Sequence, residues 1–381
     1  MKIVVITGEE SGDHLGASLI NALEKIYSQK LDIYGIGGKA LEEKGLKKFY
    51  DISEINVMGI IEVIPKIFNI KKIIDNTVNK ILDLAPDIVL TIDSPDFTLR
   101  IAKKLKKRNS NIKIIHFVAP SVWIWRSGRI NTVKESVDHL LTILPFEKEI
   151  FEKKNINTTF VGHPITEIDP DHFSDAALSD LSSDIQKNII LVLPGSRKKE
   201  VEKLLPIYLE SIRQSKWKDQ FDFVIPATKN MYELINNISN NHFPDIKVVI
   251  LRNEEQKIKS FYLADYAITT SGTAALELSY FGIAYVSGYK FNYFTYILLR
   301  SLMKMRLGNL INIILNKMLI PELLQSECTP QNINYYMDKI LNDSDYRDNI
   351  LLGTKKAIDS LNTGTNTSEL AAKAVMKLYQ S

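Results

Sequence analysis

The chain has 381 residues, a length that suits two domains better than one. Hydrophobic residues make up 45% and charged residues 24%, as in ordinary globular proteins, which excludes the disordered and fibrous classes. The net charge of +3 is too small to indicate nucleic-acid binding, and no nucleic-acid partner is predicted.

The single cysteine, Cys328, cannot form a disulfide within the chain, which favours a reducing cytoplasm. Acidic residues follow the short apolar start of the chain, which argues against a secretory signal. No run of about 18 apolar residues is present, so no transmembrane helix is predicted. Binding to a membrane surface stays open.

Short β-branched segments alternate with longer amphipathic ones along the chain. Several short segments are apolar at consecutive positions, as is typical of parallel strands covered by helices on both faces. Strands are predicted over residues 2–7, 33–36, 88–92, 113–118, 140–144 and 159–161, then over 188–193, 222–225, 247–251, 267–270 and 284–286. Helical patterns between them, such as 15–25 and 101–108, predict doubly wound parallel sheets.

Residues 169–187 interrupt this alternation because they are rich in Asp and Ser and show weak periodicity. We interpret them as a linker between two Rossmann-like α/β domains that face each other across a cleft. The predicted boundaries are 1–170 for the first domain, 171–187 for the linker, 188–355 for the second domain and 356–381 for a C-terminal helical segment.

Two glycine turns in the second half indicate a nucleotide diphosphate site. The strand predicted at 188–193 ends in Pro194, Gly195, Ser196 and Arg197, just before a helical pattern. Backbone N–H groups that open a helix attract an anion, and an arginine adds a planar charge that matches phosphate. Helix capping by Ser196 is the simpler alternative.

The second turn has the same layout, because the strand at 267–270 runs into Ser271, Gly272 and Thr273. Glu277 lies about one turn into the following helix, where it can accept hydrogen bonds from ribose hydroxyls. A capped helix with a surface glutamate is again the alternative. Two such turns at strand ends strengthen the prediction of a diphosphate site.

A third glycine turn follows the first strand and carries Glu9, Ser11 and Asp13. It lacks the spacing of dinucleotide-binding and Walker loops. Its carboxylates would repel a pyrophosphate. We therefore assign this turn to the sugar hydroxyl groups of a second substrate, distinct from the nucleotide diphosphate. Capping alone would also explain Ser11 and Asp13.

The strand at 88–92 delivers Asp93 at its carboxyl end, where a carboxylate can take a proton from an acceptor hydroxyl. Asp96 is the competing base, and both could instead cap the helix that follows. Trp123 and Arg126 lie in a segment with two tryptophans, which suits the wall of a sugar or lipid site as well as ordinary packing.

Two segments suit contact with anionic lipid. Residues 57–72 are apolar and then basic, and residues 100–108 contain six basic side chains. A core helix and a solvated helix face are the alternatives. Together the segments permit binding at a membrane interface.

These features occur in an ordered set of short motifs that spans nearly the whole chain. The motifs are GEESGD (8–13), VMGI (57–60), IDSPDF (92–97), PSVWIWR (120–126), LPFE (144–147), VGHP (161–164), LPGSR (193–197), SGTAALE (271–277), GY (288–289) and ELLQ (322–325). The set resembles the lipid-A-disaccharide synthase family.

The resemblance implies a two-domain glycosyltransferase fold, called GT-B, in which the C-terminal helix packs back on the first domain. It implies an inverting reaction between UDP-2,3-diacylglucosamine and 2,3-diacylglucosamine 1-phosphate that forms the β-1,6-linked disaccharide phosphate and UDP. It further implies a peripheral protein at the cytoplasmic face of the inner membrane of a Gram-negative bacterium. No metal and no cofactor are predicted, and a homodimer is one candidate assembly.

The resemblance also implies residue roles. Asp93 matches the catalytic aspartate, Arg197 and Glu277 match nucleotide-site positions, and Asn312 matches an asparagine of the donor site. Some relatives have proline before that asparagine, where this chain has Ile311. The alternatives are another GT-B enzyme, such as a UDP-sugar epimerase or a transferase with a different acceptor, and a non-enzymatic protein that binds nucleotide or lipid.

Overall fold

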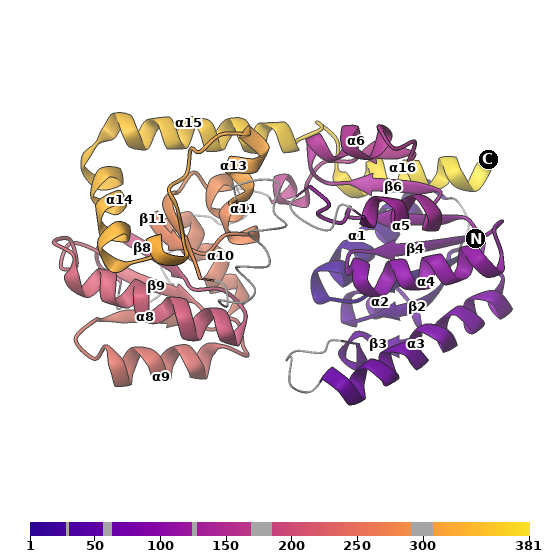
Figure 1. Cartoon of the computed structure of the whole chain (residues 1–381), viewed down its shortest axis with the longest axis horizontal. Helices are drawn as coiled ribbons and strands as arrows, with labels where there is room; N and C mark the ends of the chain where they lie inside the picture. The colour runs from indigo at the N-terminus through magenta and orange to yellow at the C-terminus, as the bar shows by residue number, and fades with distance from the viewer. Residues whose placement is uncertain (28–29, 56–62, 124–127, 169–184, 291–307) are drawn as a thin grey trace. The chain divides into compact units, whose positions relative to one another are not determined.

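The computed structural model describes residues 1–27, 30–55, 63–123, 128–168, 185–290 and 308–381 (Figure 1). The chain divides into two compact units, Met1–Glu167 with Leu361–Ser381 and Ile168–Ser360. Most of the predicted linker lies outside the described residues. Each unit holds one sheet in which all described strand pairings are parallel, which confirms the predicted α/β class.

The first unit is built on a seven-stranded sheet in the order β3-β2-β1-β4-β5-β6-β7. Its central strands β1 and β4 consist almost wholly of buried β-branched and leucine residues, because helices cover both faces. The strands are β1 Lys2–Thr7, β2 Asp32–Gly37, β3 Lys47–Asp51, β4 Ile88–Ile92, β5 Ile114–Phe117, β6 His139–Thr142 and β7 Thr158–Phe160.

In the described residues six α-helices connect these strands, and the last helix of the chain packs with them. The helices are α1 Glu10–Ile26, α2 Lys39–Glu43, α3 Val63–Leu84, α4 Pro95–Arg108, α5 Arg129–Ser136, α6 Pro145–Glu152 and α16 Thr367–Gln380. Helix α16 packs on α1, and its Ala371, Ala372 and Val375 belong to the same buried core as Leu19 and Leu23. The final helix is therefore part of the first unit.

The second unit is built on a six-stranded sheet in the order β10-β9-β8-β11-β12-β13. Its strands are β8 Ile189–Leu193, β9 Asp222–Pro226, β10 Val248–Leu251, β11 Ala264–Thr269, β12 Ala284–Tyr289 and β13 Glu322–Leu324. Its helices are α8 Lys198–Gln214, α9 Tyr232–His242, α10 Glu254–Leu263, α11 Thr273–Tyr280, α13 Leu310–Leu315, α14 Pro330–Asn342 and α15 Ser344–Leu361.

Each sheet has one position where the order of strands reverses. In the first unit the chain runs from β1 outward to β3 and then returns to β4 on the other side of β1. In the second unit it runs from β8 outward to β10 and returns to β11 beside β8. Loops that leave two such strands diverge, and ligands of open α/β sheets bind in the crevice that opens there.

Two strands, β3 and β13, do not appear among the predicted strands. Strand β3 is an edge strand whose residues are all partly or fully exposed, and β13 has three residues. Neither strand has a long apolar run in its sequence. Both are recognised as strands only because they pair with a neighbouring strand. Among the described helices, none combines the length and apolar character needed to cross a bilayer.

Candidate functional site

At the reversal point of the first sheet, the turns after β1 and β4 touch. The two strands are paired up to Thr7 and Ile92, so the chain leaves both strands at the same level. A Cβ added to Gly8 would lie 2.6 Å from Oγ of Ser94, which leaves room there only for glycine. The structure thus brings the acidic turn and the Asp93 turn together.

Asp93 and Ser94 both adopt left-handed backbone conformations, with φ of 50° and 42°. Aspartate tolerates this region better than most residues, but two successive positions cost free energy, about 1–3 kcal/mol each for unfavourable residues. The backbone N–H of Asp93 donates to Phe117 O over 2.9 Å, which anchors the turn to β5. Strained backbone of this kind clusters at functional sites.

The carboxylate of Asp93 is half-buried, and its Oδ1 accepts a hydrogen bond of 2.7 Å from the N–H of Ser94. Burial raises the pKa of Asp93, and the hydrogen bond from Ser94 only partly offsets this effect. A carboxylate with a raised pKa is a stronger base than an ordinary aspartate, which suits proton abstraction.

Asp96 lies in a different environment. Its side chain is 66% exposed, and its Oδ1 forms an ion pair of 2.5 Å with Arg129. The pairing connects the first turn of α4 to the start of α5, so the structure gives Asp96 a bridging contact on the helix surface.

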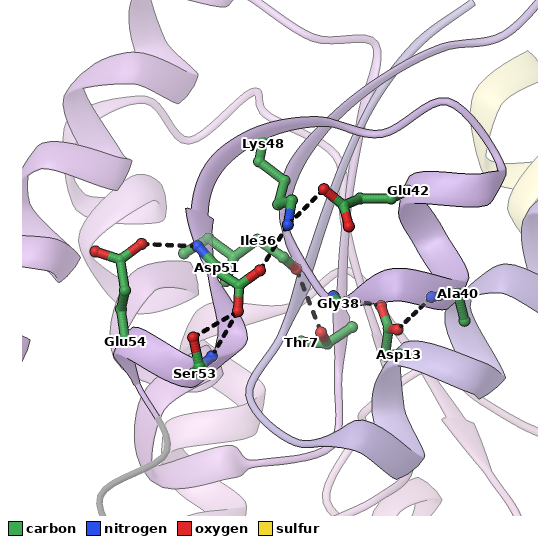
Figure 2. A network of polar contacts seen from close by, with 10 residues as sticks. All are labelled: Thr7, Asp13, Ile36, Gly38, Ala40, Glu42, Lys48, Asp51, Ser53 and Glu54. Carbon is green, nitrogen blue, oxygen red and sulfur yellow. Dashed lines mark hydrogen bonds and ion pairs between the residues drawn. The ribbon is translucent and has the colours of Figure 1, made fainter.

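The acidic turn separates its three candidate residues. Glu9 is the N-cap residue of α1, and Glu9 and Ser11 are exposed. Asp13 is buried, and its two carboxylate oxygens accept hydrogen bonds from the N–H groups of Gly38, over 2.6 Å, and Ala40, over 2.9 Å (Figure 2). Asp13 therefore holds the turn that begins α2, whereas Glu9 and Ser11 present their side chains to solvent.

A second polar cluster supports that turn from the edge of the sheet. Lys48 on β3 forms ion pairs with Glu42 of α2 and with Asp51, over 2.5 Å and 2.6 Å (Figure 2). The hydrogen bonds from Lys48 and Ser53 lower the pKa of Asp51 to about 2. These pairs connect the exposed edge strand to α2.

The segment after β5 carries Trp123, which is buried with 8% of its surface exposed. Its indole Nε1–H donates to Oε1 of Glu147 over 3.1 Å, and its ring meets Phe146 edge to face with centroids 5.1 Å apart. Arg126, the other candidate in this segment, lies outside the described residues.

At the reversal point of the second sheet, the turns after β8 and β11 lie next to each other. Leu193 pairs with Thr269, and the N–H of Thr270 donates to Leu193 O over 3.1 Å. Gly195 and Gly272 have φ of 104° and 121°, a backbone region that favours glycine. Helices α8 and α11 begin directly after these turns, so two helix N-termini open at one edge of the sheet.

Arg197 is the N-cap residue of α8, and its side chain is 73% exposed. Its Nη1 lies 3.3 Å from Oε1 of Glu200, which also accepts a hydrogen bond of 3.0 Å from the hydroxyl of Tyr289. Burial and the Glu200 carboxylate raise the pKa of Tyr289, which keeps this hydroxyl protonated as the donor. The pairs connect Arg197 to the end of β12.

The remaining candidates of this unit differ in exposure. Ser196 and Thr273 are exposed, and Ser271 and Glu277 are half-buried, with Glu277 in the second turn of α11. Backbone N–H groups and Arg197 together suit an anion, as a diphosphate site requires. In the described part of the chain, no three His, Cys, Asp or Glu side chains gather as a metal site would need.

Asn312 is fully buried in α13, and its amide is used inside the protein. Its Oδ1 accepts hydrogen bonds of 2.8 Å from the N–H groups of both Leu319 and Ile320, and its Nδ2 donates to Ile320 O over 3.0 Å. Asn312 thus orders the segment that leads into β13. A direct contact with a bound donor would require this side chain to leave these bonds.

Several contacting residues were not singled out by sequence pattern. They are Glu147, Glu200 and Tyr289. The hydrogen bond between Trp123 and Glu147 and the one between Tyr289 and Glu200 each join residues that are far apart in the sequence. The pattern of a buried strand followed by a glycine turn located the two edges, whereas the side chains that support them become visible only in three dimensions.

The two-sheet architecture with paired turns defines a fold class. It matches the solved structure of UDP-GlcNAc 2-epimerase from Neisseria meningitidis bound to UDP-GlcNAc, with a TM-score of 0.69 and 15% identity over 99% of this chain and 100% of that one. The fold is therefore GT-B, the class of two Rossmann-like domains found in glycosyltransferases and UDP-sugar epimerases.

Sequence comparison narrows this class to one family. The model of the family described as lipid-A-disaccharide synthetase matches residues 3–375. The lipid-A-disaccharide synthase of Rickettsia prowazekii is 36% identical over 99% of both chains, and that of Rhodospirillum centenum is 33% identical over 99% of this chain and 94% of its own. The chain belongs to the lipid-A-disaccharide synthase family, and it is a glycosyltransferase.

The contact between Gly8 and Ser94 generates a prediction. Gly8→Ala places a methyl group 2.6 Å from Ser94 Oγ, so either the turn after β1 or the turn after β4 must shift. We expect a loss of about 1–3 kcal/mol in the free energy of unfolding, measured by urea denaturation, together with reduced turnover.

Gly12→Ala is the matched control, because its added Cβ would meet nothing closer than 3.4 Å and alanine favours the helix that contains it. Equal stability and turnover of Gly8→Ala and the wild type would contradict the prediction.

Proposed function

We propose that the enzyme joins UDP-2,3-diacylglucosamine to 2,3-diacylglucosamine 1-phosphate, forming the β-1,6-linked disaccharide 1-phosphate and UDP with inversion at the anomeric carbon. The first unit binds the acceptor, and the second binds the UDP-sugar. The observation that carries the proposal is the half-buried, strained Asp93 beside the acidic turn, in a chain with 33–36% identity to lipid-A-disaccharide synthases.

Asp93 is the general base of this proposal. Its carboxylate takes the proton of the acceptor 6-hydroxyl, and the oxygen attacks the anomeric carbon from the face opposite UDP. The raised pKa of Asp93 favours proton abstraction. The exposed side chains of Glu9 and Ser11 in the adjacent turn are available to the acceptor's hydroxyl groups, with Trp123 and Arg126 as further contacts.

The leaving UDP carries the developing negative charge. In our proposal the N–H groups at the starts of α8 and α11 and the Arg197 guanidinium stabilise this charge, and Glu277 accepts from the ribose. Gly195, Ser196, Ser271, Gly272 and Thr273 form the turns that expose these N–H groups. Asn312 acts on the donor by ordering the segment before β13, which its buried hydrogen bonds support.

A turnover assay tests the substrate pair. Purified enzyme is given the acylated acceptor together with either UDP-2,3-diacylglucosamine or UDP-N-acetylglucosamine, which lacks the long acyl chains. The product is identified by mass. We expect UDP release and a disaccharide phosphate with the acylated donor only. Equal use of both donors, or epimerisation of the UDP-sugar without sugar transfer, would contradict the proposed reaction.

Substitution of Asp93 tests the base. Asp93→Asn keeps the size of the side chain but removes the proton acceptor, so we expect kcat to fall about 10²–10⁴-fold. A base must be ionised to act, so activity is lost as pH falls through its pKa. Because burial raises the pKa of Asp93, we expect the acidic limb of kcat/KM at a higher pH than an ordinary aspartate would give.

Asp96→Asn is the matched control, since its exposed carboxylate pairs with Arg129. It should keep turnover and the acidic limb near wild type. A folded Asp93→Asn enzyme with normal turnover, or loss of activity in Asp96→Asn alone, would transfer the role to Asp96.

We also propose that the enzyme acts as a peripheral protein on the cytoplasmic face of the inner membrane of a Gram-negative bacterium. A groove of about 440 Å³ between α3 and α4 supports this location, because it combines an apolar floor with a basic rim. Arg100, Lys71 and Lys107 on the rim are exposed. The groove is lined by Ile70, Lys71, Ile74, Arg100, Lys103, Lys104 and Lys107.

The basic rim matches the negative charge of anionic phospholipid, and each lysine or arginine near such a surface contributes about 1 kcal/mol. Two rim residues already have protein partners, since Lys103 pairs with Glu135 and Lys104 with Asp75. We therefore assign the main attraction to Arg100 and Lys107 on α4 and to Lys71 on α3.

Charge reversal tests this surface. We expect Arg100→Glu with Lys107→Glu to weaken binding to vesicles containing anionic phospholipid at least about tenfold in a sedimentation assay at low salt. Lys355→Glu with Lys356→Glu makes the same change in charge at two exposed positions of α15 and serves as the control. Equal loss in both variants would contradict a role for the groove.

A further inference from the structure

Three loops follow one another at the carboxyl edge of the first sheet. Strands β4, β5 and β6 are neighbours. The N–H of Asp93 donates to Phe117 O over 2.9 Å, and the N–H of Val118 donates to Leu141 O over 3.0 Å, so each loop begins against the strand beside it. Asp93 lies in the first loop, Trp123 in the second and Glu147 just after the third.

Glu147 is buried at 2% exposure in the first turn of α6. Its Oε1 accepts the indole N–H of Trp123 over 3.1 Å, and its Oε2 accepts the backbone N–H of Leu144 over 3.3 Å. One carboxylate therefore connects the loop after β5 to the start of α6. The adjacent Phe146 packs against the same indole with its ring nearly perpendicular to it.

The two hydrogen bonds from Trp123 and Leu144 to Glu147 both need an acceptor oxygen on the glutamate. An ionised carboxylate offers one oxygen to each donor, whereas a glutamine or a protonated acid offers only one acceptor oxygen and presents a donor on the other atom. Burial raises the pKa of Glu147 to about 7, so keeping a carboxylate here costs free energy that an apolar residue would not. The geometry explains why an acidic residue is placed here: the Glu147 carboxylate accepts hydrogen bonds from the Trp123 indole and from the backbone N–H of Leu144.

We propose that Glu147 is a positioning residue of the transferase, which fixes the indole of Trp123 as a wall of the acceptor site. This inference rests on the acceptor-side role of Trp123 proposed above. Glu147 acts only through Trp123 and the start of α6. Reactions that depend on orientation lose rate when a wall moves by a fraction of an ångström, so a buried support of this kind matters for acceptor binding.

Four full-length proteins test the inference: wild type, Glu147→Gln, Trp123→Phe and the double variant. Trp123→Phe keeps a six-membered aromatic ring against Phe146 and removes only the five-membered ring of the indole, which carries the N–H group. We expect either single change to raise KM for the acceptor about 5- to 10-fold, which corresponds to the net contribution of one ordinary hydrogen bond, with KM for the donor unchanged. The double variant should be no worse than the larger single effect.

The same proteins report on the indole itself. The emission of each protein minus that of its Trp123→Phe counterpart isolates Trp123, and we expect this difference spectrum to shift to longer wavelength in Glu147→Gln. If Glu147→Gln does not fold, Trp123→Phe alone breaks the same hydrogen bond, and an unchanged KM for the acceptor overturns the inference.

The possible failures are distinguishable. An unchanged Trp123 emission in Glu147→Gln, or additive effects on KM in the double variant, overturns the positioning role. A shifted emission with normal KM for the acceptor in all variants overturns the acceptor-site role of Trp123 instead. Absence of any transfer by the wild type overturns the proposed function, whereas the emission measurement still reports on the contact.

Discussion

The structure depends on the way parallel strands leave a sheet where their order reverses. The order of strands reverses between β1 and β4 and again between β8 and β11. In open α/β sheets the connections leave two such strands in opposite directions, and ligands bind at that position. At the reversal point of the first sheet the two turns contact each other through Gly8 and Ser94.

The same constraint explains why Asp93 and Asp96 differ although only two residues lie between them. Asp93 belongs to the turn itself, where a left-handed backbone keeps the carboxylate half-buried and burial raises its pKa. Asp96 has already entered α4, where its side chain reaches solvent and pairs with Arg129. Local backbone geometry therefore separates two aspartates of one motif into a desolvated carboxylate and a surface ion pair.

Much of the fold could be predicted from the sequence because buried parallel strands have a distinctive composition. Strands such as β4 and β8 are buried at every position, and the glycine turn after β8 is visible as a sequence pattern. The edge strand β3 and the short β13 were missed because their pairing partners define them. The same limit applies to the site: the sequence predicts the position of Asp93 after a strand, but its left-handed conformation and the buried hydrogen bonds of Asn312 to Leu319 and Ile320 become visible only in three dimensions.

The two reversal points use opposite means to present charge. In the second unit, two helix N-termini and Arg197 offer donors to an anion, and Glu200 with Tyr289 holds the arginine at the rim. In the first unit, the turns carry the carboxylates of Glu9 and Asp93, which are acceptors, whereas both oxygens of Asp13 hold the turn that begins α2. Acceptors suit hydroxyl-rich sugars and proton removal, whereas donors suit phosphate. The same backbone arrangement thus presents side chains of opposite charge at the two reversal points.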